Sequence, residues 1–224
     1  MIDMSTPLAE RLTPLVADGS ALADKVYDII GEAIATGRLA PEERVNDKEV
    51  AAALGISRTP VREALQRLTW IGLVEMAPSR YTRVTPVTET AVDSTLEYLG
   101  MQSGVALRLA MLRMDAAETE QAVALLDAVI TASDADDVDA LFPASQAFVD
   151  YLVARSGNVV LSRVMKEADL LMTRNLRGVR HRSEPAEHRT QALRRLRAAI
   201  LEGDADAAER WLRVQHGIAV DKVH

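Results

Sequence analysis

The stretch Asp47-Lys-Glu-Val-Ala-Ala-Ala-Leu-Gly-Ile-Ser-Arg-Thr-Pro-Val-Arg-Glu-Ala-Leu-Gln-Arg-Leu68 decides the fold of the N-terminal part of this chain. Apolar residues at three- and four-residue spacing on both sides of Gly55 predict two short helices around a tight turn. Gly55 ends the first helix because glycine tolerates a left-handed backbone. Ser57 is expected to cap the second helix, and Pro60 lies in its first turn, where a missing N–H costs nothing.

The second of these helices has two chemically different faces. Its apolar face comprises Val61, Ala64, Leu65 and Leu68. Its opposite face comprises Arg58, Thr59, Arg62 and Gln66. Arginine can form bidentate bonds with guanine, and hydroxyl groups can bind phosphate, so we expect this helix to enter the major groove of DNA. The alternative is a structural three-helix unit with solvated arginines.

A β-hairpin is predicted after this helix. Residues Gly72–Met76 and Tyr81–Thr85 are short β-prone runs, and a joint that contains proline and serine separates them. Arg80 and Arg83 place positive charge on the hairpin, where a minor groove or the phosphate backbone would lie. Helices and hairpin together predict a winged helix-turn-helix.

The block Leu22–Thr85 resembles the winged-helix domain of the GntR family of bacterial transcription regulators. Gly37–Val45 is similar to the family's loop after its first helix, and Leu54–Leu65 is similar to its core signature. In the family, arginine is usual at the position of Lys48, and glycine is usual at the wing tip, where this chain has Pro78-Ser79. The expected DNA contacts are Lys48, Ser57, Arg58, Thr59, Arg62, Gln66, Ser79 and Arg80.

The charge distribution favours two domains. The chain has a net charge of −7, but residues 21–85 hold equal numbers of basic and acidic side chains and residues 86–224 hold an excess of acids. Residues 56–83 contain five arginines and two glutamates, so DNA affinity should be local and salt-dependent. We expect a tail or short preliminary helix over residues 1–20, a winged-helix domain over 21–85 and a helical domain over 86–224.

The chain contains no cysteine, which excludes disulfides, thiolate nucleophiles and cysteine-ligated metals. No stretch approaches about 18 uninterrupted apolar residues, and the first residues lack the pattern of a signal peptide. We therefore expect a cytoplasmic protein.

The remainder of the chain reads as helices separated by joints that contain Asp, Gly or Pro. The predicted helices are 88–113, 115–133, 137–155, 158–178, 185–202 and 204–220. Asp115 and Glu118 form a capping-box pattern, while Gly203 ends one helix and Asp204 caps the next. Six such helices favour an antiparallel bundle, so the predicted fold class is mainly α.

This second half resembles the helical effector-binding domain, called FCD, of the FadR-like branch of the family. The segments Phe148–Asn158 and Ile200–Ala208 carry the resemblance. It implies a domain that dimerises and binds a small effector. Many members also hold a metal there, with an Asp and a His four residues apart and later histidines, and carry an arginine that meets a carboxylate effector.

Other residues occupy those positions in this chain. The matching positions are Ser145, Val149, Leu193 and Gln215 for the metal and Gly100 for the arginine. We therefore expect no metal and no other cofactor, and we interpret His188 and His216 as surface or satisfied structural groups. The alternative is a rearranged site in which these two histidines converge, but two histidines leave a divalent metal short of ligands.

Eight arginines occur between Arg174 and Arg197. They predict a solvated helical face that the acids of the bundle neutralise; alternatively, Arg174 or Arg177 binds an anionic effector. The candidate effector pocket comprises Gly100, Ser145, Val149, Arg174 and Gln215.

Together these patterns predict a homodimeric, ligand-responsive transcription regulator, a repressor, that binds a pseudo-palindromic operator, because two-fold protein symmetry matches two-fold DNA symmetry. One alternative is a constitutive DNA-binding protein whose helical domain only dimerises. The other is an enzyme, which no cysteine nucleophile, phosphate-binding glycine loop or zinc-peptidase motif supports.

The purified protein is expected to contain no stoichiometric transition metal, and chelators should change neither its melting temperature nor its DNA affinity. Elemental analysis checks this prediction. A finding of about one zinc, nickel or manganese per chain, lost in His188→Ala or His216→Ala, would contradict it.

Overall fold

The computed structural model of this protein describes residues 6–15, 21–77, 80–177 and 186–218. Helices dominate these residues, and one antiparallel hairpin is their only sheet, which confirms the predicted fold class. By its contacts the chain divides into two units, Met1–Ala91 with Ala168–Arg177 and Val92–Glu167 with Gly178–His224. The predicted boundary at residue 86 therefore leaves Ala168–Arg177 outside the winged-helix unit, whereas the contacts place it inside. No helix among the described residues is long and apolar enough to cross a membrane.

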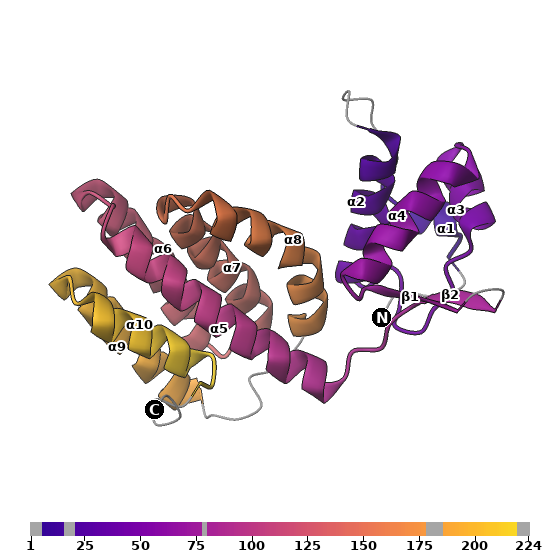
Figure 1. Ribbon diagram of the computed structural model, residues 1–224. Coiled ribbons are helices and arrows are strands. Elements are labelled where there is room, and N and C mark those ends of the chain that lie inside the picture. The colour runs from indigo at the N-terminus through magenta and orange to yellow at the C-terminus, as the bar shows by residue number, and fades with distance from the viewer. Residues whose placement is uncertain (1–5, 16–20, 78–79, 178–185, 219–224) are drawn as a thin grey trace. The chain divides into compact units, whose positions relative to one another are not determined.

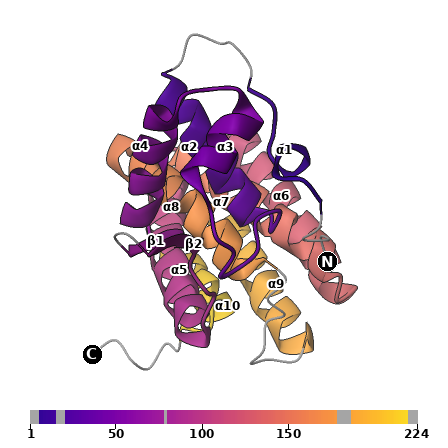
Figure 2. The same cartoon turned by 90° about the vertical axis from the view of Figure 1, so that its right-hand side faces the viewer.

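Within the described residues, the first unit consists of four helices and a hairpin, together with residues 168–177. Its elements are α1 (Leu8–Arg11), α2 (Leu22–Ala35), α3 (Asp47–Leu54), α4 (Arg58–Trp70), β1 (Val74–Ala77) and β2 (Tyr81–Val84). Both views show α2, α3 and α4 gathered together, with the hairpin following α4 (Figure 1, Figure 2). In the hairpin Val74 lies opposite Val84 and Ala77 opposite Tyr81.

The apolar face of α4 lies in the core of this unit. Its members Val61, Ala64, Leu65 and Leu68 are each at most 1% exposed. They share one apolar cluster with Ile30 and Ile34 of α2. Gly55, with φ 69°, ends α3 in the left-handed conformation and turns the chain into α4, as the sequence predicts. These contacts orient the second helix so that its other face meets solvent.

Ser57 precedes α4 as predicted, but its side chain does not cap the helix. The backbone of Ser57 is extended, and its hydroxyl makes no capping hydrogen bond. A capping oxygen accepts from the N–H of the second or third helical residue, and here the third residue is Pro60, which has no N–H. The Ser57 hydroxyl is consequently left exposed at the start of α4.

Residues 6–15, which the predicted boundary at residue 21 leaves outside the winged helix, pack into its core. Leu12 is 4% exposed and belongs to the main apolar cluster. The Arg11 guanidinium lies 2.8 Å from a carboxylate oxygen of Glu43, and both side chains are 10% exposed. Arg11 also donates to the carbonyl of Arg38. This buried ion pair fixes the N-terminal segment against the loop between α2 and α3.

The second unit is a helical bundle. Its elements are α5 (Glu89–Met111, from Val92), α6 (Ala116–Asp134), α7 (Val138–Arg155), the first part of α8 (Val159–Leu176), α9 (Ala186–Glu202) and α10 (Ala205–Gln215). α6 packs against α7 and α9, and α9 packs against α10 (Figure 1). The predicted capping box at Asp115 and Glu118 is confirmed, and Asp204 caps α10 through the N–H of Ala207. Local sequence signals therefore set where these helices begin.

The arginines of α9 bind to α6. Arg194 is exposed and Arg197 is half-buried, and they pair with Asp134 at 2.7 Å and with Asp127 at 2.6 Å, as predicted for a face whose charge the acids of the bundle neutralise. Arg189 differs from that prediction. Its side chain is only 6% exposed, and its Nε donates to the buried hydroxyl of Ser133 on α6. Three more of the eight arginines lie in the described residues, and two lie outside them.

Replacing Leu12 by alanine is expected to lower the free energy of unfolding of the chain by about 2–5 kcal/mol, because it removes a buried side chain and leaves a cavity. Urea denaturation measures this change. The matched control is Leu112→Ala, since Leu112 is 74% exposed. If both variants lose the same stability, residues 6–15 do not belong to the core.

Candidate nucleic-acid interface

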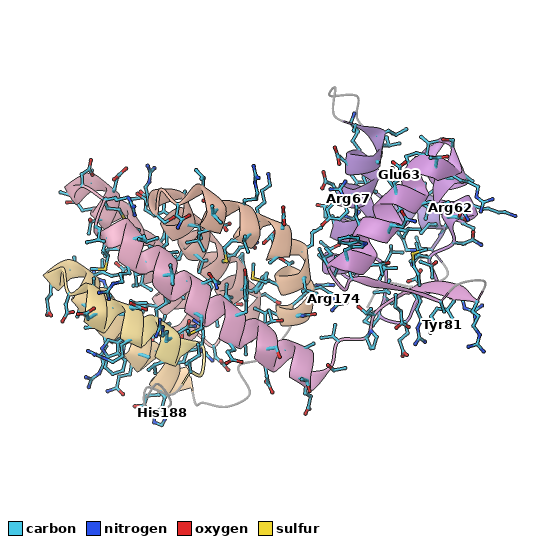
Figure 3. The ribbon with its side chains drawn as sticks, viewed as in Figure 1. Arg62, Glu63, Arg67, Tyr81, Arg174 and His188 are labelled. Atoms are coloured by element: carbon cyan, nitrogen blue, oxygen red, sulfur yellow. The ribbon has the colours of Figure 1, made fainter. Side chains whose placement is uncertain are left out.

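The first turns of α4 present polar groups away from the buried face. Arg58, Thr59, Arg62 and Gln66 are all exposed, as the helical spacing predicts. The label of Arg62 marks this part of α4 in Figure 3, and Arg67 is labelled at a separate place along the same helix. A cationic and hydroxyl-bearing helix start is suited to the phosphates and base edges of a DNA groove.

A carboxylate from α3 holds two of these arginines. Arg58 donates from Nη2 to Asp47 Oδ2 at 2.8 Å and from Nε to the same oxygen at 3.3 Å. The Nε of Arg62 lies 3.1 Å from that oxygen as well. The hydrogen bond from Arg58 lowers the pKa of Asp47, and the charge of Arg62 adds to this effect. The carboxylate is therefore ionised at neutral pH.

Local structure explains the position of Asp47. It is the first residue of α3, and the preceding Asn46 caps that helix by accepting from the N–H of Lys48 at 2.9 Å. A carboxylate in the first turn is favourable there because the helix dipole is positive at its N-terminus. Lys48, the next residue, is exposed. Sequence reasoning missed the role of Asp47, although its place beside the predicted contact Lys48 was visible.

The hairpin carries less free charge than the sequence predicts. Arg83 donates to Glu75 on the opposite strand, and its guanidinium lies 4.7 Å from the centre of the Tyr81 ring. The Glu75 carboxylate raises the pKa of Arg83. Arg80 is exposed, whereas Ser79 lies outside the described residues. Two cations were predicted for the hairpin. Within the described residues Arg83 is paired with a carboxylate, and no carboxylate partner is found for Arg80.

Arg67 lies on the same helix, but its contacts are with side chains of α2. It pairs with Asp24 of α2, and its guanidinium lies 4.3 Å from the centre of the Tyr27 ring. Arg67 and Asp24 are both about half exposed. This second ion pair on α4 joins two helices of the unit and involves none of the predicted DNA contacts.

The candidate effector residues divide between the two units. Gly100, Ser145, Val149 and Gln215 belong to the second unit and Arg174 belongs to the first. Arg174 is labelled on α8 in Figure 3. It is 8% exposed and donates to Asn175 Oδ1 at 2.7 Å and to the Thr85 carbonyl at 3.3 Å. Burial lowers the pKa of Arg174. Its donors are thus engaged within the first unit rather than with the other candidates.

Two glycines bring α5 close to the C-terminal end of the bundle. A Cβ atom on Gly100 would lie 2.7 Å from the Cβ of His216, and one on Gly104 would lie 3.3 Å from the Nε of Arg213. An arginine at position 100 would therefore displace His216. The Nδ1 of His216 lies 2.9 Å from the Leu212 carbonyl, and burial lowers the pKa of this histidine.

The residues at the metal positions do not fit a metal. Val149 and Leu193 are buried and offer no lone pair. His188 is exposed on α9, where Figure 3 labels it, and His216 is engaged by a backbone carbonyl. In the part of the chain that the structure describes, no three His, Cys, Asp or Glu side chains are grouped as metal ligands. That the protein holds no metal stays a prediction.

Two family models match this chain. The model described as "Bacterial regulatory proteins, gntR family" matches residues 22–84, and the model "FCD domain" matches residues 103–215. An HTH-type transcriptional regulator of Agrobacterium vitis, from the TAR-I ttuE-ttuC' intergenic region, is 33% identical over 65% of this chain and 89% of its own length. The "Probable D-xylose utilization operon transcriptional repressor" of Paenarthrobacter nicotinovorans is 38% identical over 41% of this chain and 40% of its own length.

The solved structure of McbR/YncC from E. coli has the same fold. It superposes with a TM-score of 0.66 and 23% sequence identity, covering 88% of this chain and 94% of that one. The family matched over residues 22–84 consists of bacterial regulatory proteins, which argues against the enzyme alternative. The chain therefore belongs to the GntR family, in the FadR-like branch that carries an FCD domain, and it is a DNA-binding transcription regulator.

Proposed function

We propose that this regulator binds a pseudo-palindromic operator as a homodimer in the cytoplasm and represses transcription until a small molecule binds its helical domain. The exposed polar face at the start of α4 is the observation that supports operator binding. It presents two arginines and two hydroxyls, while the opposite face of the helix is buried. A helix so oriented can enter a major groove with its N-terminal residues against the base edges.

Each predicted contact has a chemical role in this proposal. Arg58 and Arg62 read base edges, because guanidinium groups can bond guanine in a bidentate manner. The hydroxyls of Ser57 and Thr59 donate hydrogen bonds to phosphate. The Ser57 hydroxyl makes no capping hydrogen bond, which supports this role. The remaining proposed contacts are Lys48 on α3, Gln66 one turn further along α4, and Ser79 and Arg80 on the hairpin.

The proposed homodimer is the reason to expect a two-fold symmetric operator. Two winged helices related by a two-fold axis would meet two half-sites in the same way. An effector would then act through its differential affinity for two placements of the reading heads. The name of the Paenarthrobacter relative, a probable transcriptional repressor, supports repression as the direction of control.

A buried hydroxyl supports an effector in the helical domain. Ser103 on α5 is fully buried, and its Oγ has no hydrogen-bond partner among the described residues. The Nε of Arg213 on α10 is likewise buried without a partner. An unsatisfied buried polar group costs about 1–3 kcal/mol, so a polar ligand that reaches it would recover that free energy. The proposed pocket keeps the predicted residues of the second unit, Gly100, Ser145, Val149 and Gln215, and leaves out Arg174, which belongs to the first unit.

A constitutive regulator is the second candidate, and the packing of α5 favours it. His216 and Arg213 lie against Gly100 and Gly104, so side chains of this protein cover the position at which the family's arginine is expected. In this case the helical domain would only dimerise.

Arg62→Ala and Arg58→Ala are each expected to weaken binding to a selected operator duplex by about 1–3 kcal/mol, because each removes one base-reading guanidinium. A binding titration of the full chain at fixed salt measures this loss. Arg67→Ala is the matched control, since Arg67 lies on the same helix but pairs with Asp24. Equal affinities of the Arg62→Ala variant and the unmodified chain would refute the assignment.

A thermal-shift screen of organic acids, sugars and amino acids separates the sensor from the constitutive regulator. If the regulator responds to a ligand, at least one compound should raise its melting temperature, since a ligand that binds the folded state stabilises it. The same compound should change operator affinity in the unmodified chain. A screen in which no compound shifts the melting temperature favours the constitutive regulator.

A further inference from the structure

Asp47 forms ion pairs with two of the proposed DNA contacts, Arg58 and Arg62. It belongs to α3, while both of its partners belong to α4. Its side chain is 19% exposed, compared with 47% for Arg58 and 66% for Arg62. The carboxylate is thus the least exposed member of the group, and the two guanidinium groups are more exposed.

We propose that Asp47 determines DNA specificity by holding Arg58 and Arg62 in their reading geometry and by competing with phosphate for them. The proposal rests on the proposed role of α4 in operator binding. Arg62 uses Nε for Asp47, which leaves its two terminal nitrogens for DNA. Arg58 uses Nε and Nη2, which leaves its Nη1 uncommitted. A bidentate contact needs a guanidinium in a fixed orientation, and the shared carboxylate supplies that orientation.

Competition explains why this arrangement favours the correct sequence. Non-specific binding comes from cations that neutralise phosphates, and an arginine already paired with a carboxylate gains less from a phosphate. A negative charge beside the groove also disfavours every DNA backbone. A duplex that presents guanine edges at the right positions gains more binding free energy than non-specific DNA does. Its base contacts use the donors that Asp47 leaves available. The ionised state of Asp47, maintained by the lowered pKa, keeps this competition active at neutral pH.

The Arg67–Asp24 pair offers a matched control. It also joins an arginine of α4 to an aspartate of another helix, and its two side chains are 50% and 54% exposed. Asp24→Asn and Asp47→Asn each remove one negative charge from the same unit. Both ion pairs include an arginine that is about half exposed, and exposed pairs contribute little to stability, so both variants should fold.

The experiment uses the full-length protein with two duplexes. One is the sequence enriched by repeated selection of randomised DNA on the unmodified chain, and the other is a random duplex of equal length. Asp47→Asn is expected to bind the random duplex more tightly and with a steeper salt dependence, because two arginines are released to phosphates. The ratio of selected to random affinity should fall about tenfold. Asp24→Asn should leave this ratio unchanged.

A selection that enriches no sequence would contradict the proposed operator binding itself. If Asp47→Asn changes both affinities by the same factor, Asp47 contributes only its charge, and the specificity role is refuted while operator binding stands. The same conclusion follows if Asp24→Asn lowers the ratio as much as Asp47→Asn does.

Discussion

Burial of one face of α4 is the constraint on which the rest of the N-terminal structure depends. Val61 and Leu68 are completely buried, and they pack with residues of α2, α3 and the hairpin in one cluster. Since an α-helix repeats every 3.6 residues, burying this face fixes which positions meet solvent. Arg58 and Arg62 are exposed for that reason, and their exposure is the physical basis of the proposed DNA contacts.

Patterns that are local in sequence were enough to predict most of this fold. The glycine at residue 55, the apolar spacing of α4 and the capping box at Asp115 each act within a few residues, and each is confirmed. Ser57 shows the limit of such rules, because the proline three residues later removes a donor that its cap requires. Leu12 shows another limit, since its burial depends on packing with residues far along the chain.

The candidate site was only partly predictable for the same reason. The exposed face of α4 follows from periodicity, but the bonds of Arg58 and Arg62 to Asp47 depend on the angle between two helices, which no periodicity encodes. Arg83 was expected to supply free charge and instead pairs across the hairpin with Glu75. In the helical domain the helix starts were predictable from their caps. The surroundings of the candidate effector residues were not, because they depend on side-chain directions and on packing between helices.

The start of α4 is proposed to read DNA with arginines that Asp47 orients. A crystal structure of the full chain with its selected duplex tests this claim most directly. We expect the terminal nitrogens of Arg62 to lie within hydrogen-bond distance of a base edge in the major groove while its Nε remains paired with Asp47. A complex in which α4 lies outside the groove, or in which Arg62 contacts only phosphate, would contradict it.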